Sequence, residues 1–77
     1  MNASVLTRPQ RLAVDAIPIP VEDGAPVRCG ITRDPDRRWR TVWLKDHALR
    51  SELFGPPYAG AREAAAVSRA LNERSGA

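Results

Sequence analysis

The sequence of 77 residues contains a single cysteine, Cys29, and a single histidine, His47. One cysteine excludes an internal disulfide, so the chain does not belong to the disulfide-stabilised class of small secreted domains. One cysteine and one histidine are also too few to complete a structural zinc site. A chain this short builds only a small core, which implies a free energy of unfolding of a few kcal/mol.

Sets of residues with the spacing of a catalytic site are also absent. Cys29 and His47 could form a nucleophile and a base, but no third group lies at a recognisable spacing to orient them. Asp34 and Asp36 could share a divalent ion, yet the neighbouring arginines favour ion pairing or capping instead. A phosphate-binding glycine loop is missing as well. We therefore expect a non-enzymatic protein with no catalytic residues, no metal and no cofactor.

Long apolar segments are missing from the sequence. No run approaches the roughly 18 residues that a membrane span requires. The N-terminus lacks the charged and apolar layout of a signal peptide. We expect a cytoplasmic protein with no membrane partner.

Positive charge is what the sequence has in excess, and it is unevenly placed. The net charge is +3, and residues 28–50 contain six arginines and Lys45 against three aspartates, a sum of +4. Residues 1–27 sum to −1 and residues 51–77 balance. A cluster of cations attracts polyanions, because neutralised phosphates release their counterions. The alternative is a solvated arginine-rich surface without a partner.

The N-terminal part of the chain carries weak patterns. Residues 1–11 show none and are expected to form a flexible tail, followed by a single domain over 12–77. Residues 12–21 are apolar with β-branched members, which favours a strand. Because Pro18 and Pro20 cannot donate ladder hydrogen bonds, this strand would lie at an edge.

A period-two pattern follows. Residues 27–32 place Cys29 and Ile31 on one face, which predicts a strand whose cysteine is a small buried hydrophobic residue. A turn over 22–26 would connect this strand to residues 12–21 as a hairpin.

The next stretch allows two interpretations. Asp34 could cap a helix that begins at Pro35 and covers much of 35–53. Alternatively, residues 34–37 form a type I turn that leads into a strand over 37–44. Alternating aromatic and β-branched residues favour the strand.

In the strand interpretation, Trp39 and Trp43 face one side of the sheet and Arg40 faces the other. A short third strand would follow over 50–55. The run of Gly55, Pro56 and Pro57 would then end it.

Residues 61–74 are rich in helix formers and carry an apolar stripe that includes Val67 and Leu71. Ser75 and Gly76 would end this helix. The predicted fold is α+β, with a small antiparallel sheet of three or four strands and the C-terminal helix packed on one face. The expected core residues are Ile31, Trp39, Trp43, Val67 and Leu71.

This arrangement would bury the tryptophans under the helix and present arginines on the outer face of the sheet. We expect a small nucleic-acid-binding protein that contacts phosphates through this face, with DNA favoured over RNA. The expected contact set is Arg28, Arg33, Arg37, Arg38, Arg40 and Arg50. A double change of Arg38 and Arg40 to alanine should reduce affinity and leave folding intact.

Four short motifs carry a resemblance to known domains. They are Gly30-Ile31, Arg38-Trp39-Arg40, Leu53-Phe54-Gly55 and Glu63-Ala64-Ala65-Ala66. In this order they resemble the DNA-binding domains of plant ethylene-response factors and of some phage and transposon integrases, which consist of a three-stranded sheet and a helix. The resemblance implies that Arg28, Arg38 and Arg40 lie on a DNA-facing sheet. This chain departs from the pattern because neither turn contains a glycine and its loop over 55–60 is longer.

Residues 22–39 are similar to the hairpin and helix that begin GIY-YIG nucleases. In that alignment Arg38 takes the place of the catalytic arginine, Arg28 stands where the second tyrosine belongs, and Pro18-Ile19-Pro20 replaces the first tyrosine motif. Ser68 stands where the metal-binding glutamate belongs. This resemblance implies a catalytically inactive remnant that retains nucleic-acid binding.

A protein partner is the alternative to a nucleic acid. A chain of this size without a catalytic set fits a phage- or plasmid-encoded inhibitor or adaptor of a host protein complex. Its arginines would pair with an acidic protein surface, with Trp39 or Trp43 as an anchor, since both residue types are common in interfaces. The sequence also leaves a homodimer open. Salt dependence separates these classes, because a phosphate-driven complex weakens steeply in log salt.

Overall fold

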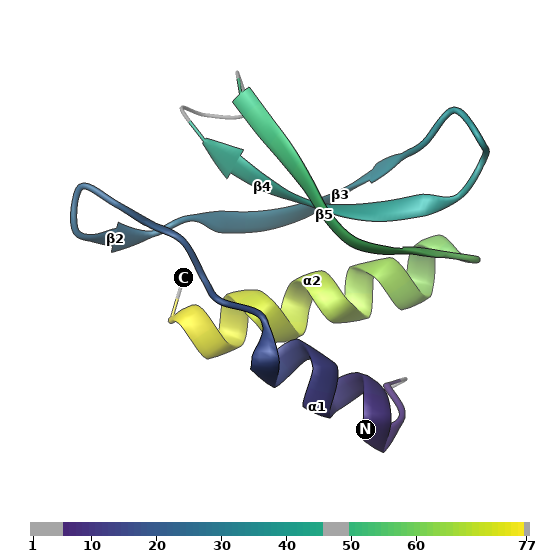
Figure 1. Ribbon diagram of the computed structural model, residues 1–77, viewed down its shortest axis with the longest axis horizontal. Coiled ribbons are helices and arrows are strands. Elements are labelled where there is room, and N and C mark those ends of the chain that lie inside the picture. The colour runs from purple at the N-terminus through teal and green to yellow at the C-terminus, as the bar shows by residue number, and fades with distance from the viewer. Residues whose placement is uncertain (1–5, 46–49, 77) are drawn as a thin grey trace.

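The computed structural model describes residues 6–45 and 50–76 of the chain. In chain order its elements are α1 (Arg8–Ala16), β1 (Val21–Glu22), β2 (Ala25–Pro26), β3 (Arg28–Arg33), β4 (Trp39–Lys45), β5 (Arg50–Tyr58) and α2 (Ala61–Ser75). Strands β3, β4 and β5 form an antiparallel sheet in that order, and β1 and β2 form a separate small hairpin. Figure 1 shows α2 along one face of the larger sheet and α1 on the far side of α2. The α+β class and the packed C-terminal helix are confirmed.

The connection between β3 and β4 decides between the two interpretations of the middle of the chain. The Arg37 N–H donates to the Asp34 carbonyl at 2.9 Å, which closes the expected turn over residues 34–37. Arg37 then has a left-handed φ of 69°, and the Asp34 N–H donates to the Arg38 carbonyl at 2.7 Å. A left-handed residue after a type I turn is a common way to close a three-residue hairpin loop. The strand interpretation is therefore correct, and β4 begins at Trp39.

Strand β5 is longer than expected. It continues through Pro56 and Pro57 to Tyr58, three residues past the predicted end at Gly55. Proline is tolerated there because β5 lies at an edge of the sheet, where an N–H is not required. Gly55 has a φ of 75° and lies where the pairing with β4 becomes irregular.

The strand predicted over residues 12–21, and its hairpin with 27–32, are wrong. Residues 8–16 form α1 instead, so Arg8 to Arg11 belong to a helix and not to a tail. The helix begins with a capping box, in which the Gln10 N–H donates to Thr7 Oγ1 at 3.3 Å and the Thr7 N–H donates to Gln10 Oε1 at 2.7 Å. These reciprocal bonds satisfy N–H groups that a helix start otherwise leaves unpaired.

The turn predicted at residues 22–26 closes a different hairpin. Asp23 and Gly24 both have positive φ, 53° and 80° respectively, between Glu22 and its partner Ala25. Aspartate followed by glycine is the preferred pair for such a two-residue turn, because its twist matches that of the flanking strands. The result is the β1–β2 hairpin, which Figure 1 shows projecting from the end of the sheet opposite the β3–β4 turn.

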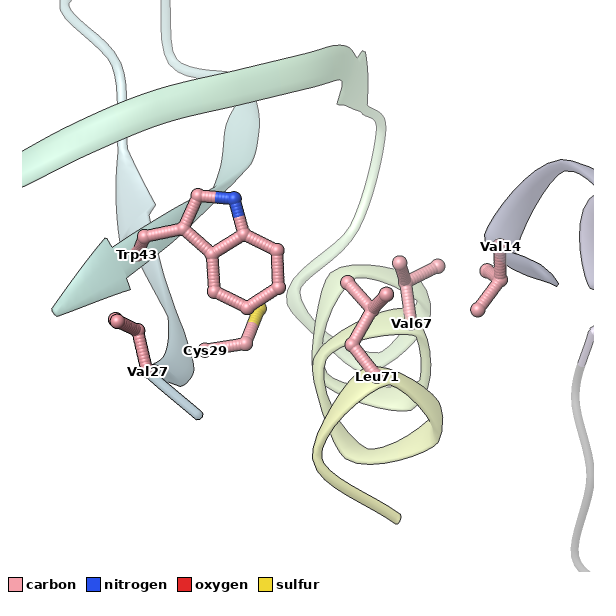
Figure 2. Close-up of a cluster of buried hydrophobic side chains, with 6 residues drawn as sticks. All are labelled: Val14, Val27, Cys29, Trp43, Val67 and Leu71. Carbon is pink, nitrogen blue, oxygen red and sulfur yellow. The ribbon is translucent and has the colours of Figure 1, made fainter. Parts of the chain in front are cut away.

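The core lies between the sheet and α2. Figure 2 shows Trp43 and Cys29 from the sheet directed toward Val67 and Leu71 of α2. Trp43 also stacks on Phe54, with ring centroids 4.5 Å apart. Burial is confirmed for Trp43, Val67 and Leu71, whose side chains are 5%, 1% and 0% exposed.

Two of the expected core residues are only half-buried. Trp39 lies at the end of the sheet beside the turn, and Ile31 lies in the edge strand β3. Cys29 is 5% exposed, as its place in the alternating strand predicts.

Polar side chains of α2 fasten it to the rest of the domain. The Arg74 guanidinium donates to the carbonyls of Val14 and Ile17 at the end of α1. At the other end of the helix pair, Gln10 Nε2 donates to Glu63 Oε2 at 2.6 Å. These contacts fix α1 against α2 at both ends.

Candidate nucleic-acid interface

The register of the sheet divides the expected contact set between two faces. Arg28 pairs with Leu44 and Arg40 pairs with Thr32, so both arginines lie on the face away from α2. Arg33 pairs with Trp39, and this pair shares the opposite face with Cys29 and Trp43. The expectation that all six arginines share one outer face is therefore wrong, because strand residues alternate between faces.

The β3–β4 turn brings the largest group of arginines together. Residues 33–40, which we call the arginine tip, contain four arginines and two aspartates. Figure 1 shows this turn extending beyond the end of the sheet, clear of α2. Arg33, Arg37 and Arg38 are exposed there. The tip is thus a cationic projection held by a closed hydrogen-bonded turn.

Arg40 supports the tip from within. Its Nε donates to Asp34 Oδ2 at 2.7 Å, and its Nη1 donates to the Gly55 carbonyl at 2.9 Å. The Arg40 side chain is 31% exposed and that of Asp34 is 14% exposed. Arg40 therefore links the turn to β5, so the predicted double change at Arg38 and Arg40 would also disturb the fold.

Arg33 is held over an aromatic ring. Its guanidinium carbon lies 5.9 Å from the centre of the Trp39 ring, within the range of a cation–π contact. Trp39 pairs in turn with Tyr58 of β5. Burial, followed by the negative charge of Glu63, raises the pKa of the Tyr58 hydroxyl, so the phenol stays neutral at physiological pH. This packing limits the freedom of Arg33 and leaves its charge exposed.

The two aspartates of the tip have structural partners. Asp34 binds Arg40, and Asp36 Oδ1 accepts a hydrogen bond from the Arg38 N–H at 3.1 Å. No cluster of three or more metal-ligating side chains occurs within residues 6–45 and 50–76. These contacts agree with ion pairing and capping as the roles of the two carboxylates.

The Cys29 thiol is buried in the core rather than placed in a cleft. Burial raises the pKa of the Cys29 thiol from its ordinary value of 9.0, which keeps it protonated at neutral pH. His47, its hypothetical partner, lies outside the described residues. The geometry therefore gives Cys29 a packing role.

The other two members of the contact set lie elsewhere. Arg28 is exposed at the start of β3, at the opposite end of that strand from the tip. The backbone of Arg50 pairs with Lys45 at the start of β5; the Arg50 side chain is outside the described part. The structure thus brings Arg33, Arg37, Arg38 and Arg40 together and leaves Arg28 apart from them.

Sequence reasoning missed the polar contacts of α2 with β3. Asn72 and Ser68 both bind the backbone of Cys29, and Arg69 lines a groove beside them. A signal existed, because Ser68 and Asn72 are spaced four apart beside the apolar stripe of the helix. Their strand partner could not be identified without the tertiary structure.

Comparisons with protein-family models, with curated proteins and with solved structures find no significant match. Neither of the two described helices has the length and apolar character to cross a membrane.

Proposed function

We propose that this chain is a non-enzymatic nucleic-acid-binding protein and that the arginine tip is its contact surface. The observation that carries the proposal is the set of three exposed guanidinium groups at the tip, those of Arg33, Arg37 and Arg38. The fourth arginine of the tip, Arg40, is paired with Asp34 and is not one of these three. An α+β fold alone implies no function, so the proposal depends on this surface.

The closed turn makes these cations effective phosphate ligands. A guanidinium group can donate two parallel hydrogen bonds to a phosphate, and a fixed backbone reduces the entropy lost on binding. Arg37 has a left-handed backbone, which costs an arginine about 1–2 kcal/mol relative to glycine. Such strain is often kept at functional positions. A side chain of use to binding explains why arginine, and not glycine, occupies this place.

The strength of binding follows from the number of phosphates contacted. Three contacts to duplex DNA correspond to a slope of about −2.7 in a plot of log affinity against log salt. Affinity should then fall roughly 40-fold between 50 and 200 mM salt. Contacts to phosphates carry no sequence information, so we expect weak discrimination between DNA sequences, with dissociation constants of about 10⁻⁴ to 10⁻⁶ M.

The test compares two double variants of equal charge by fluorescence anisotropy with a labelled DNA duplex. Arg37→Ala with Arg38→Ala removes two tip cations. Arg8→Ala with Arg62→Ala removes two exposed cations from the first turns of α1 and α2, where the helix dipole disfavours positive charge. At 100 mM salt the tip variant should bind roughly 60-fold more weakly than the parent, and its salt slope should drop by about 1.8.

The control variant should bind like the parent in the same assay. Equal losses in the two variants would show that net charge alone drives binding. No loss in the tip variant would remove the tip as the contact surface. Circular dichroism spectra of both variants would check that folding is unchanged.

A further inference from the structure

A groove runs between the edge strand β3 and helix α2. Its volume is about 440 Å³, and its lining includes Ile31 from the strand and Ala65, Ser68 and Arg69 from the helix. It is separate from the arginine tip, since none of Arg33, Arg37 and Arg38 lines it. The groove is bounded on one side by the outer edge of β3, which pairs with β4 on its other side and with no strand of the described residues on this one.

The outer edge of β3 is closed at two points. The Val27 N–H donates to the Pro20 carbonyl at 3.0 Å. The Cys29 N–H donates to Asn72 Oδ1 at 2.8 Å, and the Cys29 carbonyl accepts from Asn72 Nδ2 and from Ser68 Oγ, both at 3.0 Å. The Asn72 amide thus takes the place that a neighbouring peptide unit would have.

The same edge is open at Ile31. Backbone groups of alternate strand residues point to the same side, so the N–H and C=O of Ile31 point outward like those of Cys29. Nothing within residues 6–45 and 50–76 pairs with these two groups on that side. Arg33 continues the open edge in the same alternation. Two alternate residues of the β3 edge, Ile31 and Arg33, are therefore available for pairing.

The other edge of the sheet is protected. Strand β5 contains Pro56 and Pro57, which lack N–H groups, and the left-handed Gly55 bends it. Strand β3 has no proline between Arg28 and Arg33. An added strand would therefore pair with β3 and not with β5.

The charged side chains around the groove determine which kind of segment it binds. Arg28 and Arg69 are both exposed at its margins, and Glu73 is the one carboxylate that lines it. The excess of positive charge favours a segment that carries carboxylates. Ala65 and Ser68 have small side chains, which leaves space beside the strand for a second backbone.

We propose that this groove binds an extended acidic peptide, which adds to the sheet as a strand by pairing with Ile31 and Arg33. Peptide side chains on the α2 side would lie near Arg69, and the alternate ones, on the opposite face of the sheet, would lie on the side of Arg28. This surface meets the proposed nucleic-acid contact only at Arg33, where the peptide would use the backbone and the nucleic acid the guanidinium group.

Hydrogen exchange tests the open edge directly in the free protein. The amides of Gly30 and Thr32 point toward β4, and that of Cys29 is bound by Asn72, so all three should be protected. The amide of Ile31 should exchange much faster than these. Slow exchange at Ile31 at low protein concentration would overturn the proposal, since the edge would then be covered.

Peptide binding is measured by NMR titration of labelled protein with a hexapeptide of alternating valine and glutamate. We expect amide shifts at Ile31 and Arg33. A version methylated at the backbone nitrogens should not bind, and a version with lysine for glutamate should bind about tenfold more weakly. Arg69→Glu should reverse this charge preference, whereas the Arg37→Ala, Arg38→Ala variant should bind the acidic peptide like the parent.

Three outcomes would refute the proposal. They are unchanged spectra at millimolar peptide, equal binding of the methylated peptide, and a second copy of this chain on the β3 edge, detected as a dimer by sedimentation. Competition between peptide and DNA for the groove would refute the independence of the two surfaces. The tip variant distinguishes a failure of this inference from a failure of the proposed function, because it should lose DNA binding and keep peptide binding.

Discussion

Replacing Arg37 by glycine should stabilise the protein. Arg37 has a φ of 69°, where the Cβ of an L-residue approaches the carbonyl oxygen that follows it. Glycine has no Cβ and adopts this conformation without strain. The hydrogen bond from residue 37 to the Asp34 carbonyl uses backbone atoms only, so the substitution keeps it.

The size of the effect is a difference between two terms. The left-handed conformation costs a non-glycine residue about 1–2 kcal/mol. Glycine adds back about 0.5–1 kcal/mol, because it loses more chain entropy on folding. The free energy of unfolding should therefore rise by about 0.5–1 kcal/mol, which corresponds to about 2–8 °C in the melting temperature of a chain this size.

The control is Arg38→Gly, which removes the same charge and introduces the same residue one position later. Arg38 does not have a positive φ, so it should only lose stability, by about 0.5–1 kcal/mol. Urea denaturation followed by circular dichroism measures both variants. If Arg37→Gly is no more stable than Arg38→Gly, the left-handed strain at the tip is not real. A gain in stability together with weaker DNA binding would support a functional reason for the arginine.

Two further changes probe the core. Asn72→Ala should lower the free energy of unfolding by about 2 kcal/mol, because it leaves the Cys29 N–H unpaired. Ser68→Ala should lower it by only about 1 kcal/mol, because Asn72 still binds the Cys29 carbonyl. Equal costs in urea denaturation would contradict the role of Asn72. Burial raises the pKa of Cys29 above 9.0 and that of Tyr58 above 10.0. The contribution of these two neutral groups to the free energy of unfolding is therefore complete below about pH 9. It is lost as the pH rises through the raised pKa values that the groups have in the folded protein. Urea denaturation at pH 7.5 and about 10.5 should show this fall, smaller in Cys29→Ala, and a flat profile would contradict it.

The sequence predicted the parts of the fold that depend on strong local patterns. Strand β3 and the buried Cys29 follow from alternation, and the turn after β3 follows from proline at its second position. Helix α2 follows from its alanine content and apolar stripe. Each of these segments has one dominant signal, and tertiary contacts agree with it.

The errors have identifiable physical causes. The apolar residues around Val14 suggested a strand, although the spacing of Thr7 and Gln10 is that of a capping box and marks the start of a helix. Pro56 and Pro57 suggested the end of a strand, whereas a strand at an edge does not need their N–H groups. The capping hydrogen bonds of α1 and the edge position of β5 thus outweighed the average secondary-structure preferences of these residues.

The candidate site shows a different limit. The cluster of arginines was visible in the sequence, but its division between faces depends on the register of β3 with β4. The Arg40 side chain contacts Asp34 and the Gly55 carbonyl, and the second contact could be predicted only from the position of β5. That position depends on an irregular register between β4 and β5. Charge composition therefore predicted a cationic surface, and only the register identified which arginines are exposed on it.

In the described part of the chain, helix α2 contributes the side chain that stands where a fourth strand of the larger sheet would lie. The sequence allowed three or four strands, and the fourth position would lie beside β3. Asn72 presents both a donor and an acceptor to Cys29, as a neighbouring strand would, and so compensates one residue of that edge. One side chain cannot reach the next outward-pointing residue, because alternate residues of a strand are roughly 6.6 Å apart. The edge therefore stays open at Ile31 while the strand remains stable, and this combination permits a partner strand to bind without unfolding any part of the domain.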